Sequence, residues 1–310
     1  MIITTHAVSS TIPFPFTPVE WELVADSTFG NSNIYAIAYN SSAGQYLVGG
    51  SSGKLATSSN LAAWTSQSGT FGSSSIYALE YADGKYLAAG SVGKMSSSTD
   101  GVFWSEVDSS FGASVILTIA YAPQLNSGSG LWIAAGGSGK LATSPDGINW
   151  TQRLSSFGIS FIRSIHVTNN LLVAVGDEGK LATSTDGINW TQRFSAFDLT
   201  AIYDVTSRGQ EFVAVGDSGK ISFSLGGTSW SQVFPTTTFG TSTIRGVGVA
   251  SSAEDPFVAV ASSGKLATSF DKYVWSQRNS KFGSSTINDV YVGENIAVAV
   301  GNSGKISYSL

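Results

Sequence analysis

Seven lysines follow the pattern Gly-x-x-Gly-Lys, with Ala261 in place of the first glycine in the sixth copy: Lys54, Lys94, Lys140, Lys180, Lys220, Lys265 and Lys305. A phosphate-binding loop needs four residues between its glycines, Ser or Thr after the lysine, and a helix whose N-terminus faces the anion. Here two residues separate the glycines, Leu, Met or Ile follows the lysine, and a strand pattern comes next. The pattern therefore excludes a phosphate loop. Two interpretations are left. Either each lysine begins a strand after a hairpin turn and lies over an aromatic ring, or the seven form a cationic ring on one face that holds an acidic glycan or a symmetric partner.

Residues that depart from the repeat are the best candidates for a binding pocket. The second position of each innermost strand pattern carries Tyr35, Tyr77, Leu117, Arg163, Tyr203, Arg245 or Asn288. The next position is small, except at Asp204 and Asp289. If these strands surround a central channel, the side chains should ring its mouth on the lysine side. The candidate site consists of Tyr35, Tyr77, Arg163, Tyr203, Asp204, Arg245, Asn288 and Asp289. The alternative is a water-filled channel with a polar lining.

Several kinds of site and partner are excluded by composition. There is no Cys, and the two histidines are His6 and His166, so we expect no metal site and no cofactor. A net charge of −5 argues against nucleic acid. No apolar run approaches the roughly 20 residues that span a membrane, so we expect no membrane insertion. The first residues, Met1 to His6, lack the features of a secretory signal.

The elements that position these residues follow from an internal repeat. Successive lysines of the pattern are 40, 46, 40, 40, 45 and 40 residues apart. A tryptophan stands ten residues after six of them: Trp64, Trp104, Trp150, Trp190, Trp230 and Trp275. Each unit holds four short strand patterns, which in the fourth unit cover residues 162–167, 171–175, 180–184 and 189–193. No segment shows a helical apolar period, so we expect essentially no helix. Such units are typical of β-propeller blades.

The number of blades and the closure of the ring follow from the two ends of the repeat. The seventh lysine unit stops before its fourth strand, whereas Trp21 stands alone before the first unit. Residues ~18–25 should therefore supply the outermost strand of the last blade. We predict an all-β fold, a seven-bladed β-propeller of four-stranded antiparallel blades spanning residues 18–310. Residues 1–17 are expected to form an extended N-terminal arm.

A turn motif connects the repeat to a known family. It reads Ser-x-Asp-Gly-x-x-Trp in three units, beginning at Ser98, Ser144 and Ser184. Asn60, Gly226 and Asp271 with Lys272 depart from it. This stretch resembles the Asp-box of the BNR-repeat β-propellers, within the WD40/YVTN/BNR-like group, although that family has one more residue before Trp. The resemblance implies a turn between the third and fourth strands, and not a catalytic element.

The family includes sialidases, so a sialidase-like glycoside hydrolase is one alternative function. Its site would require three arginines, a Tyr–Glu pair and an acidic Asp. Only Arg163, Arg245 and Arg208 are free of the repeat, and Asp204 and Asp289 are two blades apart. The sequence thus predicts that the protein is not an enzyme.

The predicted function is therefore binding or assembly. Near-identical repeats suit a rigid platform, and similar propellers occur in phage tail-associated and receptor-binding proteins and in bacterial lectins. We expect a phage structural protein, associated with the tail or fibre, that contacts other virion or assembly proteins, in part through residues 1–17, or host-surface glycans. A BNR-like assembly factor is the other alternative. The expected location is the virion or the cytoplasm, and extracellular only as part of an assembly.

Overall fold

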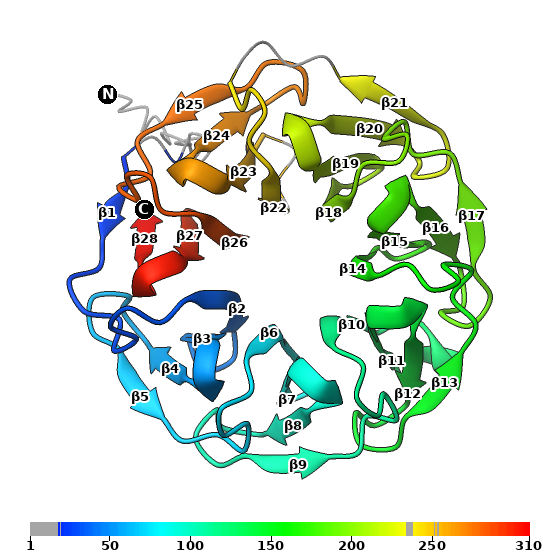
Figure 1. The fold of residues 1–310 in the computed structure, drawn as a ribbon, viewed down its shortest axis with the longest axis horizontal. Coiled ribbons are helices and arrows are strands. Elements are labelled where there is room, and N and C mark those ends of the chain that lie inside the picture. The colour runs from blue at the N-terminus through cyan, green and yellow to red at the C-terminus, as the bar shows by residue number, and fades with distance from the viewer. Residues whose placement is uncertain (1–17, 19, 234–237, 251, 253) are drawn as a thin grey trace, which may run out of the picture.

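The computed structural model describes residues 18, 20–233, 238–250, 252 and 254–310. These residues form seven four-stranded antiparallel sheets arranged as blades around a common axis (Figure 1). Each blade is a meander in which neighbouring strands are paired in chain order. The predicted seven-bladed β-propeller is therefore confirmed.

Blades 1 to 7 are numbered here in chain order, and each has one strand at each of four radial positions. The innermost strands are β2 (Ile34–Asn40), β6 (Ile76–Ala82), β10 (Ile116–Ala122), β14 (Ile162–Val167), β18 (Ile202–Arg208), β22 (Ile244–Gly248) and β26 (Ile287–Gly293). The second strands are β3 (Gln45–Gly50), β7 (Lys85–Gly90), β11 (Leu131–Gly136), β15 (Leu172–Gly176), β19 (Glu211–Gly216), β23 (Phe257–Ala261) and β27 (Ile296–Gly301). The third strands are β4 (Leu55–Ser58), β8 (Met95–Ser98), β12 (Leu141–Ser144), β16 (Leu181–Ser184), β20 (Ile221–Leu225), β24 (Leu266–Ser269) and β28 (Ile306–Ser309). The outermost strands are β5 (Thr65–Gln67), β9 (Ser105–Val107), β13 (Thr151–Arg153), β17 (Thr191–Arg193), β21 (Trp230–Val233), β25 (Ser276–Arg278) and β1 (Glu22–Leu23).

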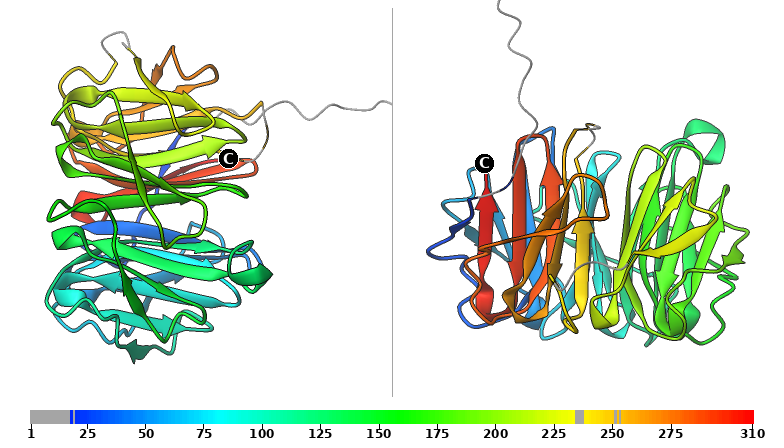
Figure 2. Two further views of the ribbon diagram at one scale, coloured as in Figure 1. Left: turned by 90° about the vertical axis from the view of Figure 1, so that its right-hand side faces the viewer. Right: turned by 90° about the horizontal axis from the view of Figure 1, so that it is seen from above.

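The strands run across the thickness of the ring, so the turns between them gather on two opposite faces (Figure 2). The Gly-x-x-Gly-Lys turns and the loops between blades share one of these faces, because every repeat lysine bonds to such a loop. We call it the lysine face. The turns between first and second strands, and between third and fourth strands, lie on the opposite face.

The two ends of the repeat close the ring as the sequence predicts. Strand β1 pairs antiparallel with β28, with Glu22 opposite Tyr308 and Leu23 opposite Ser307. The pairing continues through Val24, whose N–H donates to the Ile306 carbonyl at 2.9 Å. The last blade is thus completed by a strand from the other end of the repeat. The predicted arm at residues 1–17 lies outside the described residues.

The core is distributed over the wedges between adjacent blades. Seven hydrophobic clusters each combine side chains of two neighbouring blades; one joins Leu47 and Leu55 of blade 1 to Ile76 and Tyr86 of blade 2. Each cluster also receives one of the phased tryptophans, as Trp104 does here. The phased tryptophans therefore pack between blades, and the stability of each blade depends on its neighbours.

The structure adds one detail to the prediction of essentially no helix. Eight three-residue 3₁₀ turns occur among the described residues: η1 (Ser51–Gly53), η2 (Ser91–Gly93), η3 (Asn126–Gly128), η4 (Gly137–Gly139), η5 (Asp177–Gly179), η6 (Asp217–Gly219), η7 (Ser262–Gly264) and η8 (Asn302–Gly304). All except η3 are the turns that precede the repeat lysines. None of the helices among these residues is long and apolar enough to cross a membrane.

Candidate functional site

The repeat lysines make one shared contact. In every blade the ammonium group donates a hydrogen bond to the main-chain carbonyl of the phenylalanine in the loop that leads into that blade. The pairs and their Nζ–O distances are Lys54–Phe29 (2.9 Å), Lys94–Phe71 (3.0 Å), Lys140–Phe111 (2.7 Å), Lys180–Phe157 (2.9 Å), Lys220–Phe197 (3.2 Å), Lys265–Phe239 (2.7 Å) and Lys305–Phe282 (2.7 Å). The sequence suggested an aromatic ring as the partner of the lysine, whereas the observed partner is the carbonyl of an aromatic residue. The contact ties each blade to the loop from the preceding one.

The same turn is also fixed to the loop that leaves its blade. In blade 2, the hydroxyl of Ser109 donates to the Gly93 carbonyl at 2.6 Å and accepts the N–H of Phe111. Gly93 has φ +68°, and a Cβ there would lie 2.0 Å from the Gly112 carbonyl oxygen. Only glycine fits this approach. The phasing of lysine, glycine and serine thus has a structural explanation, and the cationic ring stays a prediction.

The innermost strands share a β-bulge that creates the ring of candidate residues. In all seven blades the pairing with the second strand shifts register around the second residue, for example between Ile34 and Ala36. A bulge re-aims the side chain of the extra residue. The bulged residues are Tyr35, Tyr77, Leu117, Arg163, Tyr203, Arg245 and Asn288.

All eight predicted pocket residues line one cavity of about 180 Å³, which we call the channel mouth. Contacts with the η turns place it on the lysine face: the Ser51 hydroxyl bonds to that of Tyr35 at 3.1 Å, and the Asn288 amide donates to the Asn302 side chain at 3.0 Å. The structure therefore brings together the residues that the sequence selected. Whether they bind a ligand stays a prediction.

One side of the channel mouth is cationic. The guanidinium of Arg163 lies 4.3 Å from the ring centroid of Tyr203, and that of Arg245 lies 5.4 Å from the same ring. Arg163 also pairs with the carboxylate of Asp177 in η5. The Nε of Arg245 is buried and has no hydrogen-bond partner. A buried N–H without a partner is unfavourable, so a ligand oxygen that accepts from it would be stabilised.

The other side of the channel mouth is aromatic. The rings of Tyr35 and Tyr77 are 5.0 Å apart and tilted by 44°. Asn33 and Ser51 both bond to the Tyr35 hydroxyl, at 3.2 and 3.1 Å. These contacts hold the Tyr35 hydroxyl in place, and both tyrosines line the channel mouth, where aromatic surface suits apolar carbon or a flat group of a ligand.

Two carboxylates link adjacent blades at the channel mouth. Asp204 accepts hydrogen bonds from Val247 N–H at 2.9 Å and the Ser164 hydroxyl at 2.7 Å. Asp289 accepts one from Ile37 N–H at 3.1 Å. Burial raises the pKa of Asp204 to about 7 and that of Asp289 to about 6, outweighing the opposite effect of these bonds. Both side chains therefore titrate near neutral pH while holding neighbouring innermost strands together.

Glu80, the fifth residue of β6, is the third carboxylate in this part of the molecule. From the sequence, Glu80 is the one glutamate that could lie at a channel position. Burial raises the pKa of Glu80 to about 8, and the charge of Asp289 adds to this increase. No group of three or more His, Cys, Asp or Glu among the residues described could hold a metal ion.

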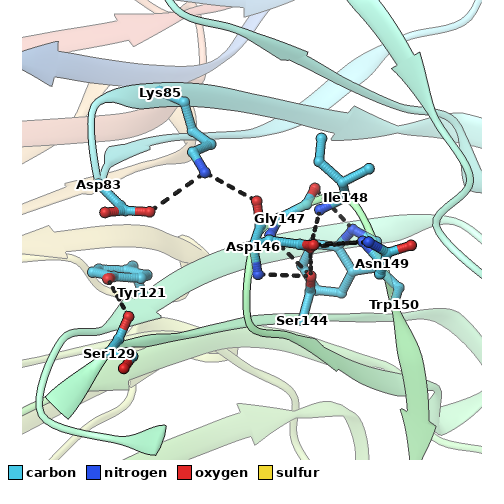
Figure 3. A network of polar contacts seen from close by, with 10 residues as sticks. All are labelled: Asp83, Lys85, Tyr121, Ser129, Ser144, Asp146, Gly147, Ile148, Asn149 and Trp150. Atoms are coloured by element: carbon cyan, nitrogen blue, oxygen red, sulfur yellow. Dashed lines mark hydrogen bonds and ion pairs between the residues drawn. The ribbon is translucent and has the colours of Figure 1, made fainter.

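The Asp-box-like turns serve the outer edge of the blades (Figure 3). Asp146 accepts the N–H groups of Ile148 and Asn149, each at 2.8 Å, and the indole N–H of Trp150 donates to the Gly147 carbonyl at 3.1 Å. Of these contacts, the hydrogen bond from the Asn149 N–H is the largest cause of the lowered pKa of Asp146. The turn thus orients the tryptophan that enters the wedge between blades. It lies on the opposite face from the channel mouth.

Sequence reasoning missed a second cavity. It has a volume of about 610 Å³ and lies between blades 4 and 5 on the face opposite to the lysines. His166, the fifth residue of β14, is among its lining residues. The available signal was the departure of His166 from the repeat, since the same position elsewhere carries Ala, Glu, Thr, Gly or Tyr.

Comparison with known proteins identifies the fold and no family. No family model and no curated protein matches the chain. Solved structures do match. YCF48 bound to D1 peptide superposes with a TM-score of 0.73 at 14% identity, covering 98% of this chain and 99% of that one. Virginiamycin B lyase from Staphylococcus aureus, in a catalytically inactive form with quinupristin, gives 0.80 at 10% identity, covering 94% and 99%. The WD40 β-propeller domain of Doa1 gives 0.74 at 10% identity, covering 94% and 96%. At these identities the likeness shows a WD40-like seven-bladed propeller.

These neighbours overturn one expectation. The sequence predicted that the protein is not an enzyme, because its free arginines and its carboxylates did not fit a sialidase-like site. Virginiamycin B lyase, an enzyme by name, has the same fold over 94% of this chain at 12% and 10% identity in two structures. The prediction that the protein is not an enzyme is therefore wrong as a conclusion about this fold. The shared fold does not by itself establish an activity.

Proposed function

We propose that the protein is a binding propeller that takes an extended, acidic segment of a partner protein at the channel mouth. The observation that carries this proposal is the pair of arginines on either side of Tyr203, with the buried Arg245 Nε left without a partner. Guanidinium groups bind carboxylates through charge-assisted, often bidentate, hydrogen bonds.

The remaining residues at the channel mouth suit a polypeptide. Tyr35 and Tyr77 offer aromatic surface for a side chain next to the carboxylate. A cavity of about 180 Å³ is too small for a large ligand but accommodates one or two side chains of a segment lying across it. The neighbour described as YCF48 bound to D1 peptide supports this proposal, because it is a propeller of this fold that holds a peptide.

Fluorescence anisotropy with two labelled peptides tests the proposal. We expect fluorescein-labelled pentaglutamate to bind and pentaglutamine to bind much more weakly. Arg245→Ala should weaken binding of pentaglutamate by at least about tenfold, since it removes a partly buried charged donor. The control is Arg278→Ala, at an outermost strand where Arg278 donates to the Thr268 hydroxyl at 3.0 Å.

Two outcomes would contradict the proposal. One is equal binding of both peptides, which would show that carboxylates are not recognised. The other is unchanged binding in Arg245→Ala together with loss of binding in Lys140→Met, which would move the site to the predicted cationic ring. Binding that depends on Lys140 would also fit the ligands predicted for the cationic ring, an acidic glycan or a symmetric partner.

The more specific predictions about biological role stay predictions. A virion or tail-associated role, docking through residues 1–17, host-surface glycans as ligands, and the virion or cytoplasm as location are not indicated by the neighbours' names. We propose the same domain division as before, with residues 1–17 separate from the propeller at 18–310. The sialidase-like and BNR-like assembly-factor alternatives lack a specific observation that favours them. Arg208, one of the three arginines considered for a sialidase site, is instead engaged with Glu211 and with two carbonyls of blade 6.

A further inference from the structure

The larger cavity between blades 4 and 5 is a second, separate feature of this propeller. Its volume of about 610 Å³ falls within the range of small-molecule sites. The turn joining β14 to β15 and the turn joining β18 to β19 form its walls, and Gly226 of the turn after β20 forms part of its rim. It lies on the face opposite to the channel mouth.

A contact made at two other blade boundaries is missing beside this cavity. At the boundary of blades 2 and 3, Lys85 at the start of β7 reaches across and donates to the Asp146 carbonyl at 3.0 Å (Figure 3). At the boundary of blades 5 and 6, Glu211 at the start of β19 pairs with Lys272 at 2.5 Å. Both contacts join the start of a second strand to the third-to-fourth-strand turn of the next blade.

At the boundary of blades 4 and 5 both partners are replaced by shorter or uncharged residues. Leu171 stands where blade 2 has Lys85, and Gly226 stands where three other blades have the aspartate of the Ser-x-Asp-Gly turn. A Cβ placed on Gly226 would meet no atom within 4 Å. No long charged side chain from either position therefore crosses this space.

Apart from Arg208, the polar side chains around this space are uncharged. The Nε2 of His166 is 2.8 Å from the Ser207 hydroxyl, and burial lowers the pKa of His166 to about 4, so the imidazole is neutral near pH 7. Arg208 also borders the cavity, but its guanidinium is directed to Glu211 and to the carbonyls of Asp255 and Phe270.

The remaining lining combines hydrogen-bonding amides with apolar carbon. Asn169, Asn170 and Gln210 each present a carbonyl acceptor and an N–H donor, and Leu171 and Phe212 supply apolar surface. Hydroxyl groups both donate and accept, so neighbouring hydroxyls on a ring match such a set of side chains. The one charged lining group, Arg208, is already bonded to Glu211 and to two carbonyls, so a carboxylate or ammonium group would find no free charged partner and would lose hydration on entering.

We propose that the cavity between blades 4 and 5 binds a small, uncharged, hydroxylated molecule of the size of a hexose. The neutral His166–Ser207 pair forms the floor of the site, and the amides of the two turns contact the hydroxyl groups. The site is independent of the channel mouth, so either proposal can fail without the other.

Nitrogen-15 NMR of the imidazole rings tests this assignment, because His166 is one of only two histidines in the chain. The probes are glucose, galactose and mannose, each compared with a charged counterpart of the same ring: glucuronate, galacturonate and mannosamine. We expect at least one neutral hexose to shift the His166 signals saturably, with a dissociation constant in roughly the millimolar range or below. The signals of His6 should not move.

Three variants locate the effect. Leu171→Lys places in this boundary the residue that blade 2 carries, and it should abolish the shift by filling the cavity. Ser207→Ala removes one hydrogen-bonding group with little change in volume, and it should weaken binding about fivefold or more. Ser42→Ala, in the exposed β2–β3 turn, is the matched control and should leave binding unchanged. If Leu171→Lys does not fold, Ser207→Ala still tests the site.

The proposal is overturned if no neutral hexose shifts the His166 signals, or if a charged counterpart binds as tightly as its neutral partner. It is also overturned if Ser207→Ala binds like the parent protein, since the shift would then arise elsewhere.

Discussion

At the scale of single residues, the repeat distinguishes side chains that build the ring from side chains that differ between blades. The lysines were visible in the sequence, but their partner was not. Each ammonium group bonds to a carbonyl 23 to 29 residues earlier, in the loop from the preceding blade. A contact of this kind depends on how two units pack, and no pattern within one unit specifies it. The residues at the channel mouth were predictable for the opposite reason, since they break the repeat at a fixed position.

Asp204 provides a prediction about pH. Its pKa is about 7 in the folded protein, whereas an unperturbed aspartate has about 3.9, so the folded state binds more protons between these values. The corresponding stability is fully present below about pH 4 and is lost as the pH rises through 7. Through Asp204, the unfolding free energy of the parent protein should fall by an amount on the order of 2 kcal/mol between pH 4 and pH 8. We expect Asp204→Asn to lack this decrease. Urea unfolding of both proteins across this range measures the difference, and identical pH profiles would contradict the prediction.

At the scale of elements, the strands were largely predictable and the bulges were not. The first strand of the fourth unit was predicted at residues 162–167 and is found at Ile162–Val167, and the second is found one residue later than predicted, at Leu172–Gly176. Alternation of apolar and small residues marks a strand, but a bulge is a property of the pairing between two strands. The cavity between blades 4 and 5 escaped prediction for a similar reason, because its walls come from turns of two adjacent blades, which no pattern within one unit specifies.

The lysine turn gives a prediction at the scale of elements. Gly93→Ala adds a Cβ that would lie 2.0 Å from the Gly112 carbonyl oxygen, at a residue with φ +68°. We expect a loss of about 3 kcal/mol or more in unfolding free energy, from the clash and the left-handed backbone together. Gly112→Ala is the matched control, because Gly112 has φ +56° and a Cβ there meets no atom within 4 Å. It should lose only about 1–2 kcal/mol. Equal losses in denaturant unfolding would show that the close approach has no effect of its own.

At the scale of the whole molecule, the ring depends on one pair of adjacent strands, β1 and β28 of blade 7, that no turn joins. Every other blade is covalently complete, whereas blade 7 takes its outermost strand, β1, from the other end of the repeat. This strand has only two residues. Additional contacts support it: the Ser27 hydroxyl donates to the Gly304 carbonyl, and Lys54 bonds to Phe29. The other blades are joined by the same contacts. The place where the ring closes is therefore held like the rest of the repeat, although no peptide link joins β28 to β1.

Closure of the ring is tested at Trp21, which packs with Val258 and Leu266 of blade 6 and with Phe282 and Ile287 of blade 7. Trp21 is 2% exposed, so Trp21→Ala should lower the unfolding free energy by about 3–5 kcal/mol, as expected for a buried tryptophan. The comparison variant is Trp275→Ala, at 3% exposure between blades 5 and 6, where the chain is continuous. If blade 7 is held in the ring as firmly as the other blades, both variants should unfold in a single transition with similar losses of unfolding free energy. The reason is that opening one wedge exposes apolar surface on both adjacent blades. A separate early transition in Trp21→Ala alone would show that blade 7 opens independently, and that closure by β1 is not required for the rest of the ring.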